Sequence, residues 1–507
     1  MQNSTTTNRV MKGMFWVFLG NGIQIVLQIV TLGVLARMIS LQDFGLANAA
    51  IIVIGLMNLL SLWIGPAIIQ RKDLSERHIR TGFTVSLILG VILTALANLL
   101  APAFAGFMNM ENLVPIIKIA SLIFIIQSVF VIPDALLARN LRFGTQTIVQ
   151  VVSYLLGYGL VGIVLALMHW GVWALVAATL GQAIIETVLS YIWQPFPKSF
   201  MFDEQAFKEL FYFGGGLTIA KFCNYLAYNG DNFVVGRWLG EKALGLYSRA
   251  FQMISIPSTM FGTVLDTVLF PAMSAIQDSV TRLKAAFRRG VLFIAVVVLP
   301  ISVLSIILAP EIIRIILGNQ WDGAIVPFQI LALTMLFRTS YRMSDSLARA
   351  TGAVYHRAWR QFLFGFFVIF GAWSGSHWGL PGVAWGVFLA NIINFLLMAQ
   401  LSLKLISMSW KEFFDIQFPS LGFALFTFLI IWLAVTLMRS SSVSPILIVL
   451  ISVFLMGVFL TLVLIKRPFF LLGADGLWAL DMLETNFAAF LPSPLRRFLG
   501  IVRNAYK

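Results

Sequence analysis

Three charged side chains lie inside a long apolar stretch, at a spacing that places them on one helical face. They are Arg338, Arg342 and Asp345, at positions i, i+4 and i+7. A charge within hydrocarbon is costly, so such residues normally face a partner or a water-filled cavity. Because arginine pairs with phosphate through two parallel hydrogen bonds, this face would suit a phosphate-bearing substrate.

Two further apolar stretches carry polar stripes. The stripe over 211–236 consists of Lys221, Asn224, Tyr225, Tyr228 and Asn232, with Asp231 at its edge. The stripe near the N-terminus consists of Asn21, Gln24, Gln28 and Thr31. Amide and phenol groups hydrogen-bond sugar hydroxyls. Together with the cations they predict a cavity for a molecule that carries a pyrophosphate and sugar hydroxyls.

Three carboxylates inside predicted spans are candidates for coupling transport to protons. They are Asp231, Asp266 and Asp345, and burial can make such a group protonatable near neutral pH. The alternative is that these charges pair within the protein, Arg342 with Asp345 and Arg249 with Asp266. Lys221 and Arg338 have no obvious acidic neighbour one turn away, so we expect them to face the cavity.

The composition is that of a membrane protein. The 507 residues are 59% hydrophobic and 11% charged, whereas a soluble domain carries about 25% charged residues. The single cysteine excludes a disulfide framework and a cysteine metal site. The motifs GxxxxGK[ST] and HExxH are absent, as is any nucleophile–base arrangement. We therefore expect no cofactor, no metal and no enzymatic activity.

The apolar runs are long enough for membrane helices, which need about 20 residues to cross the bilayer. They are too long and too continuous for barrel strands. The sequence predicts an all-α membrane protein with about fourteen spans: 13–36, 45–68, 81–105, 113–137, 146–168, 170–193, 211–236, 245–272, 286–309, 323–347, 359–377, 380–404, 417–438 and 444–465.

The distribution of lysine and arginine predicts the orientation. With the N-terminus in the cytoplasm, 25 of the 35 basic residues fall in segments predicted to be inside, as the positive-inside rule requires. Both termini are then cytoplasmic. The net charge of +14 is explained by topology and by anionic lipid, and we expect no nucleic-acid partner.

The chain contains an internal repeat. Val34–Ala50 returns as Val234–Ala250, with Arg37 on Arg237 and Gly45 on Gly245. Six spans per half give a parallel repeat, whose transport site is expected in a central cavity between the halves. The predicted segments are a tail (1–12), an N-lobe (13–193), a linker (194–210), a C-lobe (211–404), two extra spans (405–466) and an amphipathic cytoplasmic tail (467–507).

Three segments resemble the signatures of Wzx-type polysaccharide exporters, and most of all the colanic-acid-exporter type. These segments are LARMISLQDFGLANAA (35–50), IIQRKDL (68–74) and LFPAMSAIQDS (269–279). These exporters belong to the multidrug/oligosaccharidyl-lipid/polysaccharide flippase superfamily. The resemblance implies alternating access of two lobes, with Asn224, Tyr225 and Arg338 where the family places polar groups.

The substrate that the resemblance implies is an undecaprenyl-diphosphate-linked oligosaccharide. It would cross the bacterial inner membrane for assembly into exopolysaccharide, capsule or O-antigen of lipopolysaccharide. A polysaccharide polymerase and chain-length proteins are candidate partners.

Three other functions stay open from the sequence. A cation-coupled multidrug exporter of the same superfamily would need an acidic, aromatic-lined cavity. A peptidoglycan-precursor flippase would share the lipid carrier. A membrane glycosyltransferase, polymerase or ligase would need an extended outside domain, and the short outside loops argue against it.

Overall fold

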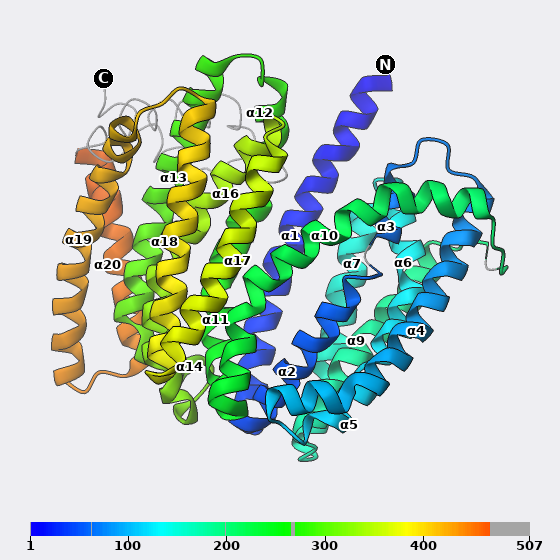
Figure 1. The fold of residues 1–507 in the computed structure, drawn as a ribbon. Coiled ribbons are helices and arrows are strands. Elements are labelled where there is room, and N and C mark those ends of the chain that lie inside the picture. The colour runs from blue at the N-terminus through cyan, green and yellow to red at the C-terminus, as the bar shows by residue number, and fades with distance from the viewer. Residues whose placement is uncertain (1, 62, 198, 265–268, 467–507) are drawn as a thin grey trace. The chain divides into compact units, whose positions relative to one another are not determined.

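The computed structural model describes the chain except for residues 1, 62, 198, 265–268 and 467–507 (Figure 1). The described residues form helices, turns and loops, with no strand among them. The all-α fold predicted from the apolar runs is therefore confirmed. The predicted cytoplasmic tail and the coupling candidate Asp266 lie outside the described residues.

The described chain divides into two compact units. Unit 1 consists of Met1–Arg249, Ile316–Trp321 and Ala372–Val383, and unit 2 of Ala250–Ile315, Asp322–Gly371 and Ala384–Lys507. The seventh predicted span thus belongs to unit 1 together with the first six. The division into lobes at 194–210 stays a prediction.

Unit 1 contains the N-terminal helices. They are α1 (Gln2–Met38), α2 (Leu41–Asn58), α3 (Ile64–Gln70), α4 (Glu76–Met108), α5 (Leu113–Ala120), α6 (Ile123–Arg139), α7 (Phe143–Ser153), the π-helix η1 (Tyr154–Val161), α8 (Gly162–Leu167), α9 (Val172–Trp193), α10 (Glu204–Val234), the π-helix η2 (Val235–Leu239) and the start of α11 (Gly240–Val264). α4 and α6 lie side by side (Figure 1). Their packed core includes Trp63, Phe83 and Ile132.

The segment before α10 and the first turns of α10 are held against α4 by side-chain hydrogen bonds. The backbone N–H groups of Met201 and Asp203 each donate to a threonine of α4 at 3.1 Å. Glu209 accepts from His78 Nε2 at 2.9 Å and lies 2.7 Å from Arg71 Nη2. The hydrogen bond from His78 and the charge of Arg71 hold the pKa of Glu209 below its ordinary value.

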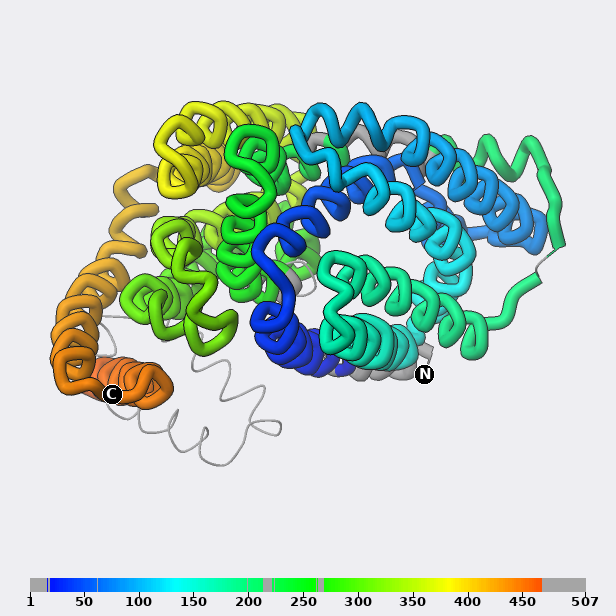
Figure 2. The backbone as a smooth tube through the Cα atoms, turned by 90° about the horizontal axis from the view of Figure 1, so that it is seen from below, coloured from blue at the N-terminus to red at the C-terminus, as the bar shows by residue number. Residues whose placement is uncertain are grey.

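Unit 2 contains the remaining helices. They are α12 (Phe270–Ala275), α13 (Val280–Ile307), most of α14 (Ala309–Ile316), the 3-10 helix η4 (Asn319–Ala324), α15 (Ile325–Leu333), α16 (Met335–Ala350), α17 (Val354–Ser376), α18 (Gly379–Leu405), α19 (Trp410–Ser440) and α20 (Pro445–Lys466). η4, α17 and α18 each have one end in unit 1. α19 and α20 lie side by side (Figure 2), and α19 packs on α13 around buried Leu299, Ile431 and Ile448.

Ten helices of the described chain are long and apolar enough to cross a membrane, or eleven if the bent pair α15–α16 counts as one span. The predicted number of about fourteen is therefore not confirmed. α10, α11 and α17 are the long helices outside this set, and each carries charged residues, as Lys221 and Asp231 on α10 illustrate. Polar residues lower the apolarity of a helix whether it faces lipid or the protein interior.

Candidate functional site

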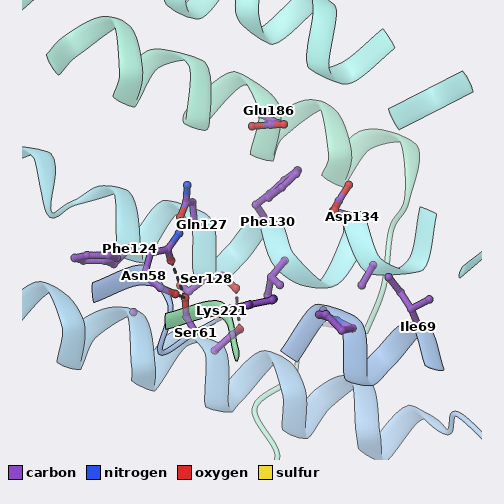
Figure 3. A pocket seen from close by; sticks show the side chains of 16 residues that line it. Asn58, Ser61, Ile69, Phe124, Gln127, Ser128, Phe130, Asp134, Glu186 and Lys221 are labelled. Carbon is purple, nitrogen blue, oxygen red and sulfur yellow. Dashed lines mark hydrogen bonds between the residues drawn. The ribbon is translucent and has the colours of Figure 1, made fainter. Parts of the chain in front are cut away.

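A cavity with both apolar and polar lining residues lies in unit 1 (Figure 3). It has a volume of about 330 Å³ and is lined from α2, α3, α4, α6, α9 and α10. Sites for small molecules usually enclose about 300–1,000 Å³ and combine apolar walls with a few polar groups. We refer to it as the unit-1 cavity.

The helical break between α2 and α3 forms one wall. α2 ends at Asn58 and α3 begins at Ile64, within one predicted span. Ser61 Oγ donates to the backbone oxygen of Asn58 at 2.9 Å and to its side-chain oxygen at 2.7 Å. Pro66 has no N–H to continue a helix, but is tolerated in the first turn of α3. Non-helical backbone at membrane depth is acceptable where it lines a cavity.

An amide pair stands at the edge of the unit-1 cavity. Asn58 Nδ2 donates to Gln127 Oε1 at 3.0 Å. The same two residues also line a second cavity of about 190 Å³, whose other lining side chains are almost all apolar, among them Ile54 and Leu175. Asn58 and Gln127 therefore line both the unit-1 cavity and this second, more apolar cavity.

Charged residues from three different helices line the unit-1 cavity. Asp134 comes from α6, Glu186 from α9 and Lys221 from α10, and Figure 3 shows them around one space. Asp134 accepts a hydrogen bond from Gln146 Nε2 at 2.8 Å. Of this set, only Lys221 is among the site residues predicted from the sequence. The signal for the other two was available, since both carboxylates lie inside predicted spans.

The other predicted residues of α10 make contacts within unit 1. Tyr225 Oη donates to the backbone oxygen of Ile52 at 2.7 Å, and so ties α10 to α2. Asn232 accepts from Asn48 Nδ2 at 3.5 Å. Asp231 accepts from Tyr247 Oη at 2.8 Å. None of these three lines the unit-1 cavity.

The remaining predicted side chains of unit 1 are half-buried. Asn224 and Tyr228 lie on α10, one and two turns beyond Lys221, and Asn21, Gln24 and Gln28 lie on α1. None of the five lines the unit-1 cavity. A role for them in binding substrate stays a prediction.

The predicted arginine face of α16 lies in unit 2, where Arg338 is buried and Arg342 is half-buried. Arg338 is 8% exposed, and its guanidinium carbon lies 4.5 Å from the centre of the Phe251 ring. Arg342 packs against the backbone of Gly262. Their role in binding phosphate stays a prediction.

Asp345 lies in a cluster with two arginines other than Arg342. Its carboxylate is 3.1 Å from Arg349 Nε and also pairs with Arg357 of α17. The alternative local pair of Arg342 with Asp345 stays a prediction.

The fold is that of a class of membrane transporters. The structure is similar to the lipid II flippase MurJ in an inward closed conformation, with a TM-score of 0.71 and 15% identity over 89% of this chain and 98% of that chain. It is also similar to an inward-facing multidrug resistance transporter of the MATE family, with a TM-score of 0.61 and 15% identity over 75% and 94% of the two chains. At these identities the likeness establishes the fold alone.

The sequence comparisons define the family. Residues 34–326 match the family described as polysaccharide biosynthesis protein, and the chain belongs to that family. It is 25% identical to the teichuronic acid biosynthesis protein TuaB of Bacillus subtilis (strain 168), over 81% of this chain and 85% of that protein. It is 26% identical to the lipopolysaccharide biosynthesis protein WzxC of Escherichia coli (strain K12), over 80% and 83%.

Proposed function

We propose that this protein is a flippase that moves an undecaprenyl-diphosphate-linked oligosaccharide across the bacterial inner membrane. The product would serve the assembly of exopolysaccharide, capsule or O-antigen. The observation that carries this proposal is a cavity with polar and charged lining residues beside the break between α2 and α3, in a chain of the polysaccharide biosynthesis family.

The physical task of such a protein is to carry a polar head group through hydrocarbon. Sugar hydroxyls and phosphates lose their hydrogen bonds with water in the bilayer, at a cost of several kcal/mol for each group left without a partner. A cavity with amide, hydroxyl and charged side chains replaces those bonds, while the polyprenyl tail stays in lipid. Alternating access of two lobes then exposes the head group first to the cytoplasm and then to the outside.

The phosphates would be bound by cations inside predicted spans. The candidates are Arg338 and Arg342, which share one face of α16. Lys221 of α10 lies in the unit-1 cavity beside Asp134 and Glu186, and would contact the sugar part of the head group. Both chain termini would lie in the cytoplasm. The protein would work with a polymerase and chain-length proteins while itself performing no chemistry.

A peptidoglycan-precursor flippase would use the same lipid carrier, and essentiality of the gene would favour this alternative function.

Deletion of the gene tests this proposal in cells. The proposal predicts that surface polysaccharide is lost, and that lipid-linked repeat units collect on the cytoplasmic face. Complementation with the intact gene should restore both. Labelled repeat units that still reach the outside at the normal rate in the deletion strain would overturn it.

The lining of the unit-1 cavity supports a second candidate, a multidrug exporter. Asp134 and Glu186, together with Phe124 and Phe130, supply the acidic and aromatic lining that an organic cation would need (Figure 3). This function predicts increased susceptibility of the deletion strain to cationic drugs. Unchanged susceptibility would exclude it.

A further inference from the structure

We propose that the unit-1 cavity is a carbohydrate subsite that accepts a neutral or amino sugar and rejects a sugar acid. This inference rests on the proposed flippase function and specifies which part of the substrate head group enters unit 1. It depends on three features of the cavity: its hydrogen-bonding groups, its aromatic walls and its balance of charges.

The hydrogen-bonding groups suit a polyol. In the amide pair, the side-chain oxygen of Gln127 accepts a hydrogen bond from Asn58. The two N–H groups of the Gln127 amide take no part in this bond. The side-chain oxygen of Asn58 accepts a hydrogen bond from Ser61. This bond fixes which end of the Asn58 amide faces Gln127. When ionised, the carboxylates of Asp134 and Glu186 accept hydrogen bonds and donate none. Donors and acceptors therefore line one space, as sugar hydroxyls require.

Aromatic rings supply part of the apolar lining. Phe124 and Phe130 of α6 both line the cavity, and Figure 3 shows them near Gln127 and Glu186. A pyranose ring presents C–H groups on its faces and hydroxyls on its rim. A cavity with phenyl rings on α6 and polar groups on α6, α9 and α10 can contact both parts at once.

The charges of the lining residues decide between kinds of sugar. Two carboxylates, Asp134 and Glu186, face one ammonium group, Lys221. A sugar carboxylate would add negative charge beside these two acidic groups in a space of low dielectric constant, where like charges repel strongly. A neutral sugar avoids that repulsion, and an ammonium group on an amino sugar is attracted. The cavity therefore selects against uronic acids.

The full-length protein in lipid nanodiscs provides the test, with soluble monosaccharides as probes. N-acetylglucosamine, glucosamine and glucuronate are added separately, with sorbitol as the control for osmotic effects, and the unfolding midpoint is followed by intrinsic fluorescence. The first two sugars should raise the midpoint. Glucuronate should have no more effect than sorbitol, which corresponds to an apparent Kd at least about tenfold weaker.

Substitutions at Glu186 sharpen the test. Glu186→Gln keeps the size of the side chain and should remove the advantage of glucosamine over N-acetylglucosamine. Glu186→Lys reverses the charge and should make glucuronate the stabilising sugar. Glu204→Gln is the matched control, because this carboxylate lies on the surface of the same unit, 2.6 Å from Lys208. It should leave all responses unchanged.

Three results would overturn the subsite. They are stabilisation of the wild type by glucuronate to the same extent as by glucosamine, no response to any of the sugars, or an unaltered pattern in Glu186→Gln. The unfolding midpoint without sugar shows whether each variant is folded. Export of repeat units in cells is a separate measurement. A chain that exports normally but does not discriminate sugars refutes the subsite alone, whereas a chain that does not export refutes the proposed function.

Discussion

Gly45 and Gly245 occupy the same position in the two copies of the repeat, and they pack against each other inside unit 1. A Cβ atom on Gly245 would lie 3.3 Å from the backbone nitrogen of Gly45 and would collide with the backbone oxygen of Leu41. A Cβ atom on Gly45 would collide with the backbone of Glu241, the repeat equivalent of Leu41. Such reciprocal contacts are what a twofold axis produces.

This close approach predicts that neither glycine tolerates a side chain. Gly245→Ala should destabilise the protein by about 1–3 kcal/mol, because the backbone of α2 must move to make room. The measurement is the unfolding midpoint in nanodiscs, together with abundance in the membrane. Gly106→Ala on α4 is the control, since nothing lies within 4 Å of its Cβ position. A wild-type midpoint for Gly245→Ala would contradict the packing.

The hydrogen bond from Tyr225 to Ile52 predicts a structural role for a residue first expected in the substrate cavity. Tyr225→Phe should cost about 1 kcal/mol of stability, because it leaves a backbone carbonyl without this donor. Tyr212→Phe is the matched control, since Tyr212 is 91% exposed. If Tyr225→Phe abolishes export at an unchanged unfolding midpoint, Tyr225 acts on the substrate and the structural role is wrong.

The cluster of Glu209 with His78 and Arg71 predicts a pH-dependent contribution to stability. The pKa of Glu209 is lowered in the folded protein, so its interactions stabilise fully above the ordinary value of 4.5. That contribution is lost as pH falls through the lowered pKa. Glu209→Gln should therefore reduce the unfolding midpoint at neutral pH, and the difference from wild type should shrink on acidification. A difference that grows at low pH would contradict the sign.

The pairing of Asp345 with two arginines predicts that this carboxylate is structural. Asp345→Asn leaves Arg349 and Arg357 with a neutral neighbour, and should cost about 2 kcal/mol. Reduced membrane abundance should account for any loss of export. Normal abundance with export that no longer depends on pH would instead support the original proton-coupling hypothesis for Asp345.

The fold class could be predicted from the sequence because apolar runs of membrane length leave few alternatives. The predicted number of about fourteen spans is not confirmed, since α10 and α17 carry charges and fall outside the ten or eleven described helices that are apolar enough to cross a membrane. The internal repeat could also be predicted from the sequence. The close packing of Gly45 and Gly245 explains why both copies of the repeat have glycine at this position.

The candidate site was predicted only in part. Helical periodicity places residues on a face of their own helix, and so it identified Lys221. It does not show which other helices meet that face, and so Asp134, Glu186 and Gln127 were missed. The partner of Asp345 on α17 was missed for the same reason, because Arg357 lies twelve residues away across a turn.

The most direct test of the flippase function uses purified protein in liposomes. A fluorescent undecaprenyl-diphosphate-linked oligosaccharide is placed in both leaflets, and its access to an added membrane-impermeant quencher is followed over time. The account predicts that liposomes with the protein expose the inner-leaflet pool, while protein-free liposomes keep it protected. Equal protection in both would contradict the claim that this chain moves lipid-linked oligosaccharides across the membrane.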